Sequence, residues 1–371
     1  MSRPGLRRRW LTVAGVVAAL VALPGILAAV PASTPDVSVA ELVRRARGSQ
    51  DVAYQGYAES SGRLPLPDAG PLDEVADLLG DRSRLRAWWV SPVRHRVDVL
   101  TPIGERDTYV EPGRRVRWDS FERKVRIVRG VSPSVRVPQP GDMLPAALGR
   151  RLLSGAGPKE VRLAGTERVA GHEAVTLAVT PRDRRTLVER IEVAVEPRTG
   201  LPLRVEVTAR GRSRPDVVSE FLDLRLARPA EARLRFRPPS DAATELVESL
   251  DARELAGEVP FVLPDTVAGL RRRAEVGGGA GSYGTGYAIL AVVPIPPHVV
   301  HRLEHRLQNP RAVPVEIEGG GSGILLQSSL LTTLTLRAGD RAYLLVGSVT
   351  RAVVEGAARQ LVAEPPEWDY Q

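Results

Sequence analysis

The sequence contains no cysteine, two methionines and few aromatic residues, and these scarcities exclude several kinds of chemistry. Without cysteine the chain has no disulfide, no thiolate nucleophile, no cysteine-ligated zinc and no lipid anchor on a cysteine. Aromatic residues make up 4% of 371 residues, so Val, Leu and Ala must fill most of the interior. An apolar content of 43% nevertheless suffices for ordinary folded cores and argues against disorder.

Lysine is almost absent, since Lys124 and Lys159 are the only two, and the positive charge comes from arginine. The formal net charge of +8 could attract nucleic acid or anionic lipid. The arginines are, however, spread among acidic residues, and no recognition-helix or RNA-binding motif accompanies them. We therefore expect no nucleic-acid partner.

The N-terminus carries an export signal. Arg7, Arg8 and Arg9 precede an uncharged run at residues 10–30, and positive charge before an apolar segment keeps that end in the cytoplasm. The body of the chain is therefore expected outside the cytoplasm, in the periplasm or cell envelope. Residues 1–32 fit a cleaved signal peptide and a retained transmembrane anchor at about residues 10–30 equally well.

Pro- and Gly-punctuated runs of alternating polarity predict antiparallel strands over most of the chain. Helices are expected near 38–47, where Ser38 and Glu41 form a capping-box pattern, and at 72–79, 143–153, 244–255, 297–307 and 349–361. The length favours two domains. We expect a sheet domain at 36–228, a linker and helix at 229–257, and a smaller α+β domain at 258–364.

A strand meander at residues 84–119 supplies the candidate binding residues. His95, Val97 and Val99 alternate with Arg96, Asp98 and Leu100, as on a half-buried strand. By the same alternation, one of Trp88 and Trp89 belongs to the core. The predicted concave apolar face consists of Trp89, Val97, Val99, Tyr109 and Trp118. A closed core under covering helices explains these residues equally well.

Two motifs suggest enzyme chemistry without the context that it needs. Residues 301–305 spell H-R-L-E-H, in which histidines one helical turn apart could bind zinc beside a glutamate base. No further carboxylate ligand on a second helix is evident, and a solvated helix face explains the same letters. Residues 279–284 match G-x-G-x-x-G, but a strand and not a helix is expected to follow, which favours a hairpin loop. No metal or cofactor is expected.

Four segments together resemble the MucB/RseB family and its LolA-like (lipoprotein-carrier-like) N-terminal domain. They are Y-Q-G-Y at 54–57, the meander at 88–118, A-G-H-E-A-V-T-L at 170–177 and I-E-V-A-V-E-P-R-T-G-L-P-L-R at 191–204. The resemblance implies an α+β fold, with an incomplete antiparallel β-barrel covered by helices and a smaller C-terminal α+β domain. The second domain makes the chain more similar to MucB/RseB than to LolA.

The resemblance also implies a function without catalysis. It predicts an exported sensor of envelope stress, in sigma-factor regulation, that binds an anti-sigma-factor-type membrane protein. A lipid or lipoprotein in the concave sheet is the ligand that it would imply. The alternative is a LolA-like carrier of lipid or lipoprotein, and a more remote one is a zinc hydrolase using residues 301–305.

Overall fold

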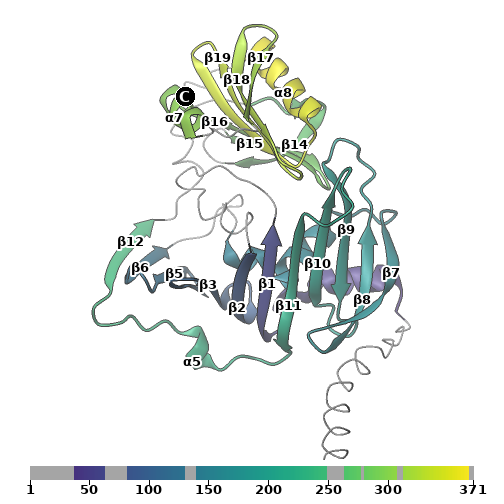
Figure 1. Cartoon of the computed structure of the whole chain (residues 1–371), viewed down its shortest axis with the longest axis vertical. Helices are drawn as coiled ribbons and strands as arrows, with labels where there is room; N and C mark the ends of the chain where they lie inside the picture. The colour runs from purple at the N-terminus through teal and green to yellow at the C-terminus, as the bar shows by residue number, and fades with distance from the viewer. Residues whose placement is uncertain are drawn as a thin grey trace, which may run out of the picture.

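The computed structural model describes residues 37–62, 82–129, 139–248, 263–276, 280–306 and 312–366. Within these ranges the strands form two sheets, of twelve and eight strands, accompanied by few helices (Figure 1). The expected export segment at 1–32 and the expected helix at 72–79 lie outside the described residues. None of the helices in the described ranges has the length and apolarity required to cross a bilayer.

The larger sheet is open. Its order is β12-β6-β5-β4-β3-β2-β1-β11-β10-β9-β8-β7, with β12 and β7 at the two edges of the described sheet. The strands are β1 (Tyr54–Gly62), β2 (Arg82–Ser91), β3 (Arg94–Thr101), β4 (Gly104–Glu111), β5 (Arg114–Asp119), β6 (Lys124–Arg129), β7 (Val161–Val169), β8 (His172–Val179), β9 (Val188–Val195), β10 (Pro202–Ala209), β11 (Val217–Arg225) and β12 (Ala243–Glu248). The expected antiparallel pairing is confirmed for β1 to β11, whereas β12 is parallel to β6, and the described strands do not close into a barrel.

Short helices lie against this sheet: α2 (Val39–Gly48), η1 (Ser49–Asp51), η3 (Pro140–Met143), α4 (Pro145–Gly155) and α5 (Glu231–Leu234). The predicted N-cap of α2 is present, because Ser38 Oγ accepts a hydrogen bond from the Glu41 backbone N–H at 3.2 Å. The apolar side of α2 and the end of α4 share one core with β8 to β11. Gly149 lets α4 approach β10 closely, since a Cβ there would lie 2.5 Å from Pro202 Cβ.

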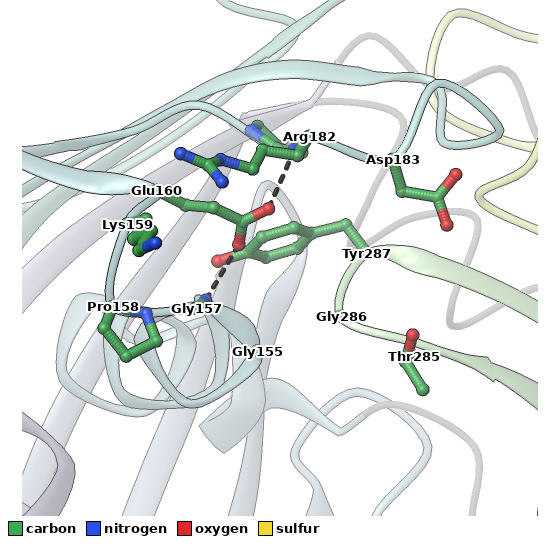
Figure 2. Close-up of a pocket in the computed structure, with 11 residues that line it drawn as sticks. Gly155, Gly157, Pro158, Lys159, Glu160, Arg182, Asp183, Thr285, Gly286 and Tyr287 are labelled. Atoms are coloured by element: carbon green, nitrogen blue, oxygen red, sulfur yellow. Dashed lines mark hydrogen bonds between the residues drawn. The ribbon is translucent and has the colours of Figure 1, made fainter.

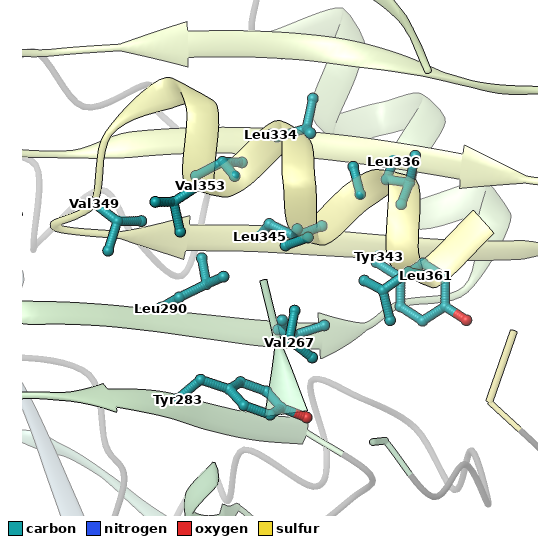
Figure 3. Close-up of a cluster of buried hydrophobic side chains, with 14 of the residues drawn as sticks. Val267, Tyr283, Leu290, Leu334, Leu336, Tyr343, Leu345, Val349, Val353 and Leu361 are labelled. Atoms are coloured by element: carbon teal, nitrogen blue, oxygen red, sulfur yellow. The ribbon is translucent and has the colours of Figure 1, made fainter. Parts of the chain in front are cut away.

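The smaller sheet has the order β13-β14-β15-β16-β20-β19-β18-β17. Its elements are β13 (Thr266–Val267), β14 (Leu270–Val276), β15 (Ala280–Thr285), β16 (Ala288–Pro294), α7 (Pro297–Arg306), β17 (Ala312–Ile317), β18 (Gly321–Gln327), β19 (Thr332–Ala338), β20 (Arg341–Gly347) and α8 (Arg351–Ala363). Helix α8 packs on Leu345 and Tyr343 of β20 (Figure 3). Helix α7 packs on Ala342 and Leu344, which alternate along β20 with Tyr343 and Leu345. The two helices therefore cover opposite faces.

Three sequence predictions are wrong within the described ranges. The helix expected at 244–255 begins instead as strand β12, because pairing along β6 overrides the helical preference of A-T-E-L-V-E. Residues 280–284, expected in a loop, form β15, which turns at Gly286 into β16. Strand β18 was not expected, because its glycines depress strand propensity. The helices expected near 38–47 and at 143–153, 297–307 and 349–361 lie within a few residues of their predicted positions.

Candidate functional site

The five predicted binding residues do not share one face. Direct partners across a sheet lie on the same side, and Val97 of β3 pairs with Thr108 of β4. Tyr109 is therefore on the side opposite to Val97. Trp89, Val97 and Val99 contribute to one buried cluster, whereas Tyr109 and Trp118 contribute to another. The prediction of a single concave face is corrected in this respect, and a ligand-binding role for the five residues stays a prediction.

Trp89 is packed on all sides. Its ring stacks on His95 with centroids 4.2 Å apart and on Tyr54 at 6.0 Å, and its indole N–H donates to the Gln50 carbonyl at 2.8 Å. The Arg150 guanidinium carbon of α4 lies 5.7 Å from the ring centroid. Burial raises the pKa of the Tyr54 phenol and lowers the pKa of Arg150. Arg150 Nη1 and the Tyr54 hydroxyl are buried without a hydrogen-bond partner in the structure.

The opposite side of the meander, which we call the Arg96 face, is built around one guanidinium. It comprises Trp88, Arg96, Tyr109, Val116 and Trp118. The Arg96 guanidinium carbon lies 4.8 Å from the Trp88 ring centroid and 4.7 Å from that of Tyr109. Sequence analysis did not single out Arg96. A charged residue at the centre of a Val- and Trp-rich meander was the signal that could have found it.

Arg96 also neutralises two buried carboxylates. It donates to both oxygens of Asp98, at 2.6 and 2.8 Å, and to Asp107 Oδ2 at 2.8 Å. Asp98 is fully buried and Asp107 is 3% exposed. Carboxylate oxygens of Asp98, Glu105 and Asp107 lie within 4.8 Å of one another, which is close enough to share a cation. Arg96 already supplies that positive charge, so the cluster gives no reason to invoke a metal.

Burial, together with the charge of Asp98, raises the pKa of Asp107 to about 7, although Arg96 acts in the opposite direction. A carboxyl whose pKa is raised in the folded state binds a proton that the unfolded chain has already released. Between about pH 4 and pH 7 the native state therefore binds more protons, and the free energy of unfolding falls as the pH rises.

Because the pKa of Asp107 is raised, the effect of Asp107→Asn on the free energy of unfolding should depend on pH. We expect the variant to be more stable than the parent at pH 8 by about 1–3 kcal/mol, with a smaller difference at pH 5, because asparagine removes a buried charge. Urea unfolding of both proteins at the two pH values measures the difference. Asp223→Asn, at an exposed position on β11, is the control and should show no such dependence. A difference that is equal at both pH values would contradict the assignment.

The two sheets are joined through the β8–β9 connection. Thr186 forms an isolated bridge with Val349, and its hydroxyl donates to the Tyr287 carbonyl at 2.8 Å. The Leu187 backbone N–H donates to the Ser348 carbonyl at 3.0 Å. Tyr287 of the β15–β16 turn is buried in the core of the larger sheet, where its hydroxyl donates to the Leu152 carbonyl at 2.6 Å. A residue of the second sheet thus completes the core of the first.

A cavity of about 530 Å³ opens beside this joint (Figure 2). It is lined by the end of α4, the α4–β7 loop, the β8–β9 connection and the β15–β16 turn, through Gly155, Gly157, Pro158, Lys159, Glu160, Pro181, Arg182, Asp183, Thr285, Gly286 and Tyr287. Glu160 accepts from the Gly157 and Arg182 backbone N–H groups, each at 2.8 Å. Burial raises the pKa of Tyr287, so its phenol remains a donor. The wall carries the exposed bases Lys159 and Arg182 together with the acids Glu160 and Asp183, and Asp183 pairs with Arg185 at 2.8 Å.

The structure places the two enzyme motifs, at residues 301–305 and 279–284, in surroundings that differ from those of zinc and nucleotide sites. Glu304 faces the sheet, where it accepts a hydrogen bond from Thr335 at 3.2 Å and pairs with Arg337 at 3.5 Å, while His301 is exposed. The glutamate is therefore engaged as an acceptor within the second sheet. Residues 280–284 of the glycine motif lie in β15, and no helix N-terminus follows to hold a pyrophosphate.

The larger sheet is open and is backed by helices, and the second sheet is joined to its core. This architecture agrees with the fold that the sequence resemblance implied. Residues 122–226, from the β5–β6 turn to the end of β11, match the family model of the MucB/RseB N-terminal domain. The resemblance to the MucB/RseB family is therefore confirmed over this segment. No curated protein matches the chain.

Several solved structures are similar to this chain. The MucA/MucB complex of Pseudomonas aeruginosa shares 19% identity, covering 85% of this chain and 95% of that chain, with a TM-score of 0.47. MucB in complex with MucA(peri) shares 19% identity over 86% and 97%, with a TM-score of 0.45. A LolA-superfamily protein from Nitrosomonas europaea shares 14% identity over 54% and 98%, with a TM-score of 0.24.

Proposed function

We propose that this protein is an exported, non-enzymatic regulator of the MucB/RseB type, which binds an anti-sigma-factor-type membrane protein outside the cytoplasm. The observation that carries the proposal is the match of residues 122–226 to the MucB/RseB N-terminal domain. The run of three arginines before the uncharged segment 10–30 supports export. Within this proposal, residues 36–228 and 258–364 act as two domains.

The joint between the sheets is the place where we locate partner binding. Its cavity has residues of both sheets in its wall, so a partner segment seated there would contact both and depend on how they are arranged. Glu160 accepts from backbone N–H groups and Asp183 pairs with Arg185, so an acidic side chain of the partner would meet the two exposed bases, Lys159 and Arg182. A ligand that prefers another arrangement of the sheets would release the partner, by no more than its differential affinity for the two states.

The proposal is tested by cross-linking the tagged full-length protein in its native membrane and identifying the captured proteins by mass spectrometry. We expect a single-pass anti-sigma-type protein among them. The Lys159→Glu/Arg182→Glu variant should recover it at least about tenfold less efficiently, because each rim charge is reversed. Arg168→Glu/Arg198→Glu, at exposed positions on β7 and in the β9–β10 turn, is the matched control. Absence of such a partner from the parent protein would overturn the proposal.

A second candidate function is the carriage of lipid or lipoprotein. One observation favours it, namely the two buried donors beside Trp89, Arg150 Nη1 and the Tyr54 hydroxyl, that have no hydrogen-bond partner in the structure. Unpaired buried donors are costly, and an anionic group beside an apolar surface would satisfy both. Lipid extraction from the same purification tests this function. Lipid that is recovered from the parent and lost in Arg150→Met would support it, with the folded state checked by circular dichroism.

A further inference from the structure

The Arg96 face is covered by a single extended segment, residues 228–248, which we call the strap. The strap leaves the larger sheet after β11, forms α5 and returns as β12 along the outer edge of the sheet (Figure 1). Phe236 is its central contact, with its ring centroid 5.2 Å from that of Tyr109 and 6.4 Å from that of Trp118. Arg233 lies over Trp88, with its guanidinium carbon 5.9 Å from the ring centroid.

The strap also pairs with β6 along β12, and it forms ion pairs with acids on the strap and bases on the sheet. Glu231 pairs with Arg94, Asp241 with Arg123, and Glu245 with Lys124 at 2.7 Å. Arg126 lies 3.5 Å from the same Glu245 carboxylate. Arg94 lies on the Arg96 face, whereas Lys124 and Arg126 alternate with Val125 and Ile127 and lie on the other face of β6. An extended chain along β6 alternates between the two faces, so its complement carries an aromatic residue toward the Arg96 face and an acid toward Lys124 and Arg126.

Apart from the pairing of β12 with β6, the strap makes few buried side-chain contacts for a segment of its length. Leu234 is buried and Phe236 half-buried, whereas most strap residues around them are exposed. The Arg123–Asp241 side chains are 54% and 60% exposed, and exposed ion pairs contribute only about 0–1 kcal/mol each. Strand β12 is an edge strand and the single parallel strand in the described part of the larger sheet. The surface beneath, by contrast, holds Val116 and Val125 at 1% exposure.

We propose that the Arg96 face is a docking surface for an extended acidic segment of a partner protein, bearing one aromatic residue, and that the strap occupies it in the absence of that partner. The partner segment would pair with the freed edge of β6 by strand addition and place its aromatic side chain between Tyr109 and Trp118, where Phe236 now lies. Its acids would meet Arg94, Arg123 and Lys124. This inference is independent of the joint cavity and of the proposed family function.

A disulfide that can be closed and opened tests the proposal on one protein. The chain has no native cysteine, and Ile127 and Leu246 are direct partners between β6 and β12. In the Ile127→Cys/Leu246→Cys variant, oxidation locks the strap to the sheet and reduction releases it. The probe is a fluorescein-labelled synthetic peptide copying residues 228–248, the segment whose acids and phenylalanine occupy this surface in the structure. We expect the reduced protein to bind it at least about tenfold more tightly than the oxidised protein.

A second pair of variants separates strap displacement from general loosening. Phe236→Ala should strengthen binding of the peptide about tenfold, because the apparent dissociation constant falls as the fraction of protein with a free surface rises. Phe121→Ala is the matched control, since Phe121 is 66% exposed in the β5–β6 turn, and it should change nothing. A peptide with its four acids changed to lysine and its phenylalanine to alanine should not bind.

Two results would overturn the proposal. One is equal binding of the peptide to the oxidised and reduced forms, or equal binding of the charge-reversed peptide, which would show that the strap does not cover the binding surface. The other is a concentration-dependent dimer of Phe236→Ala in light scattering that excludes the peptide. That result would assign the surface to the strap of a second copy.

Discussion

Replacing Arg96 by methionine should lower the free energy of unfolding at pH 8 by about 3–5 kcal/mol, because it leaves two buried carboxylates without their counter-charge. The Arg96 side chain is 16% exposed, and it pairs with Asp98 at 2.6 Å and with Asp107 at 2.8 Å. Methionine preserves much of the volume between Trp88 and Tyr109, so lost packing contributes little. Urea unfolding followed by circular dichroism measures the loss.

The same variant should lose less stability at pH 5 than at pH 8. Burial and the neighbouring charge of Asp98 raise the pKa of Asp107 to about 7, so at pH 5 Asp107 is protonated and one of the two unpaired charges disappears. Adding Asp98→Asn and Asp107→Asn to Arg96→Met should restore most of the stability at pH 8, because no buried carboxylate is then left without a counter-charge.

Arg86→Met is the matched control for this prediction. Arg86 lies on the same face, on β2, and pairs with Glu105, but its side chain is 42% exposed. Exposed pairs contribute about 0–1 kcal/mol, so this substitution should have a small effect. Equal losses for Arg86→Met and Arg96→Met would contradict the view that Arg96 organises this face.

Most of the larger sheet could be predicted from the sequence, because alternation and turn residues are local signals. The meander shows this well: Trp89 is 4% exposed while Trp88 is half-buried, as the alternation predicted. The helix start at Ser38 was equally readable from its S-x-x-E spacing. Each of these features depends on residues within one strand or one helical turn.

The candidate site could not be predicted to the same extent, because it depends on register between strands. Pro102 and Ile103 form a two-residue turn between β3 and β4, and Thr101 pairs with Gly104 across it. Odd-numbered residues of β3 therefore pair with even-numbered residues of β4, which moves Tyr109 to the side opposite to Val97. The turn length was visible in the sequence, and applying it would have divided the five residues correctly.

Contacts over long sequence separations left no local signal at all. The pairing of β12 with β6 joins residues more than a hundred positions apart, and the segment A-T-E-L-V-E taken alone favours a helix. Tyr287 follows a glycine in a turn, which predicts an exposed residue and not one in the core of another sheet. Tertiary packing decides both positions, so neither the strap nor the joint was predictable from patterns in the chain.

Tyr287 is the basis of the second large prediction, because its side chain reaches from the β15–β16 turn into the core of the larger sheet. It is 7% exposed within the core of the larger sheet, its hydroxyl donates to the Leu152 carbonyl at 2.6 Å, and its own carbonyl accepts from Thr186 and Ser348. Tyr287→Ala should remove about 3–5 kcal/mol of stabilisation from the joint, since truncation of a large buried side chain leaves a cavity. Calorimetry should then resolve two unfolding transitions, one for each sheet.

Tyr287→Phe separates the hydroxyl from the ring. It keeps the packing and leaves the Leu152 carbonyl without its donor, so we expect a loss of about 1 kcal/mol and unchanged coupling of the two sheets. Tyr57→Ala, on β1 and away from the joint, should lower the transition of the larger sheet without splitting it further from the other. A partner held across the joint cavity should be lost in Tyr287→Ala and retained in Tyr287→Phe.

If Tyr287→Ala unfolds as the parent does, the joint does not depend on this residue. If instead the transitions separate while partner recovery is unchanged, the partner binds elsewhere, and the Arg96 face becomes the surface to test.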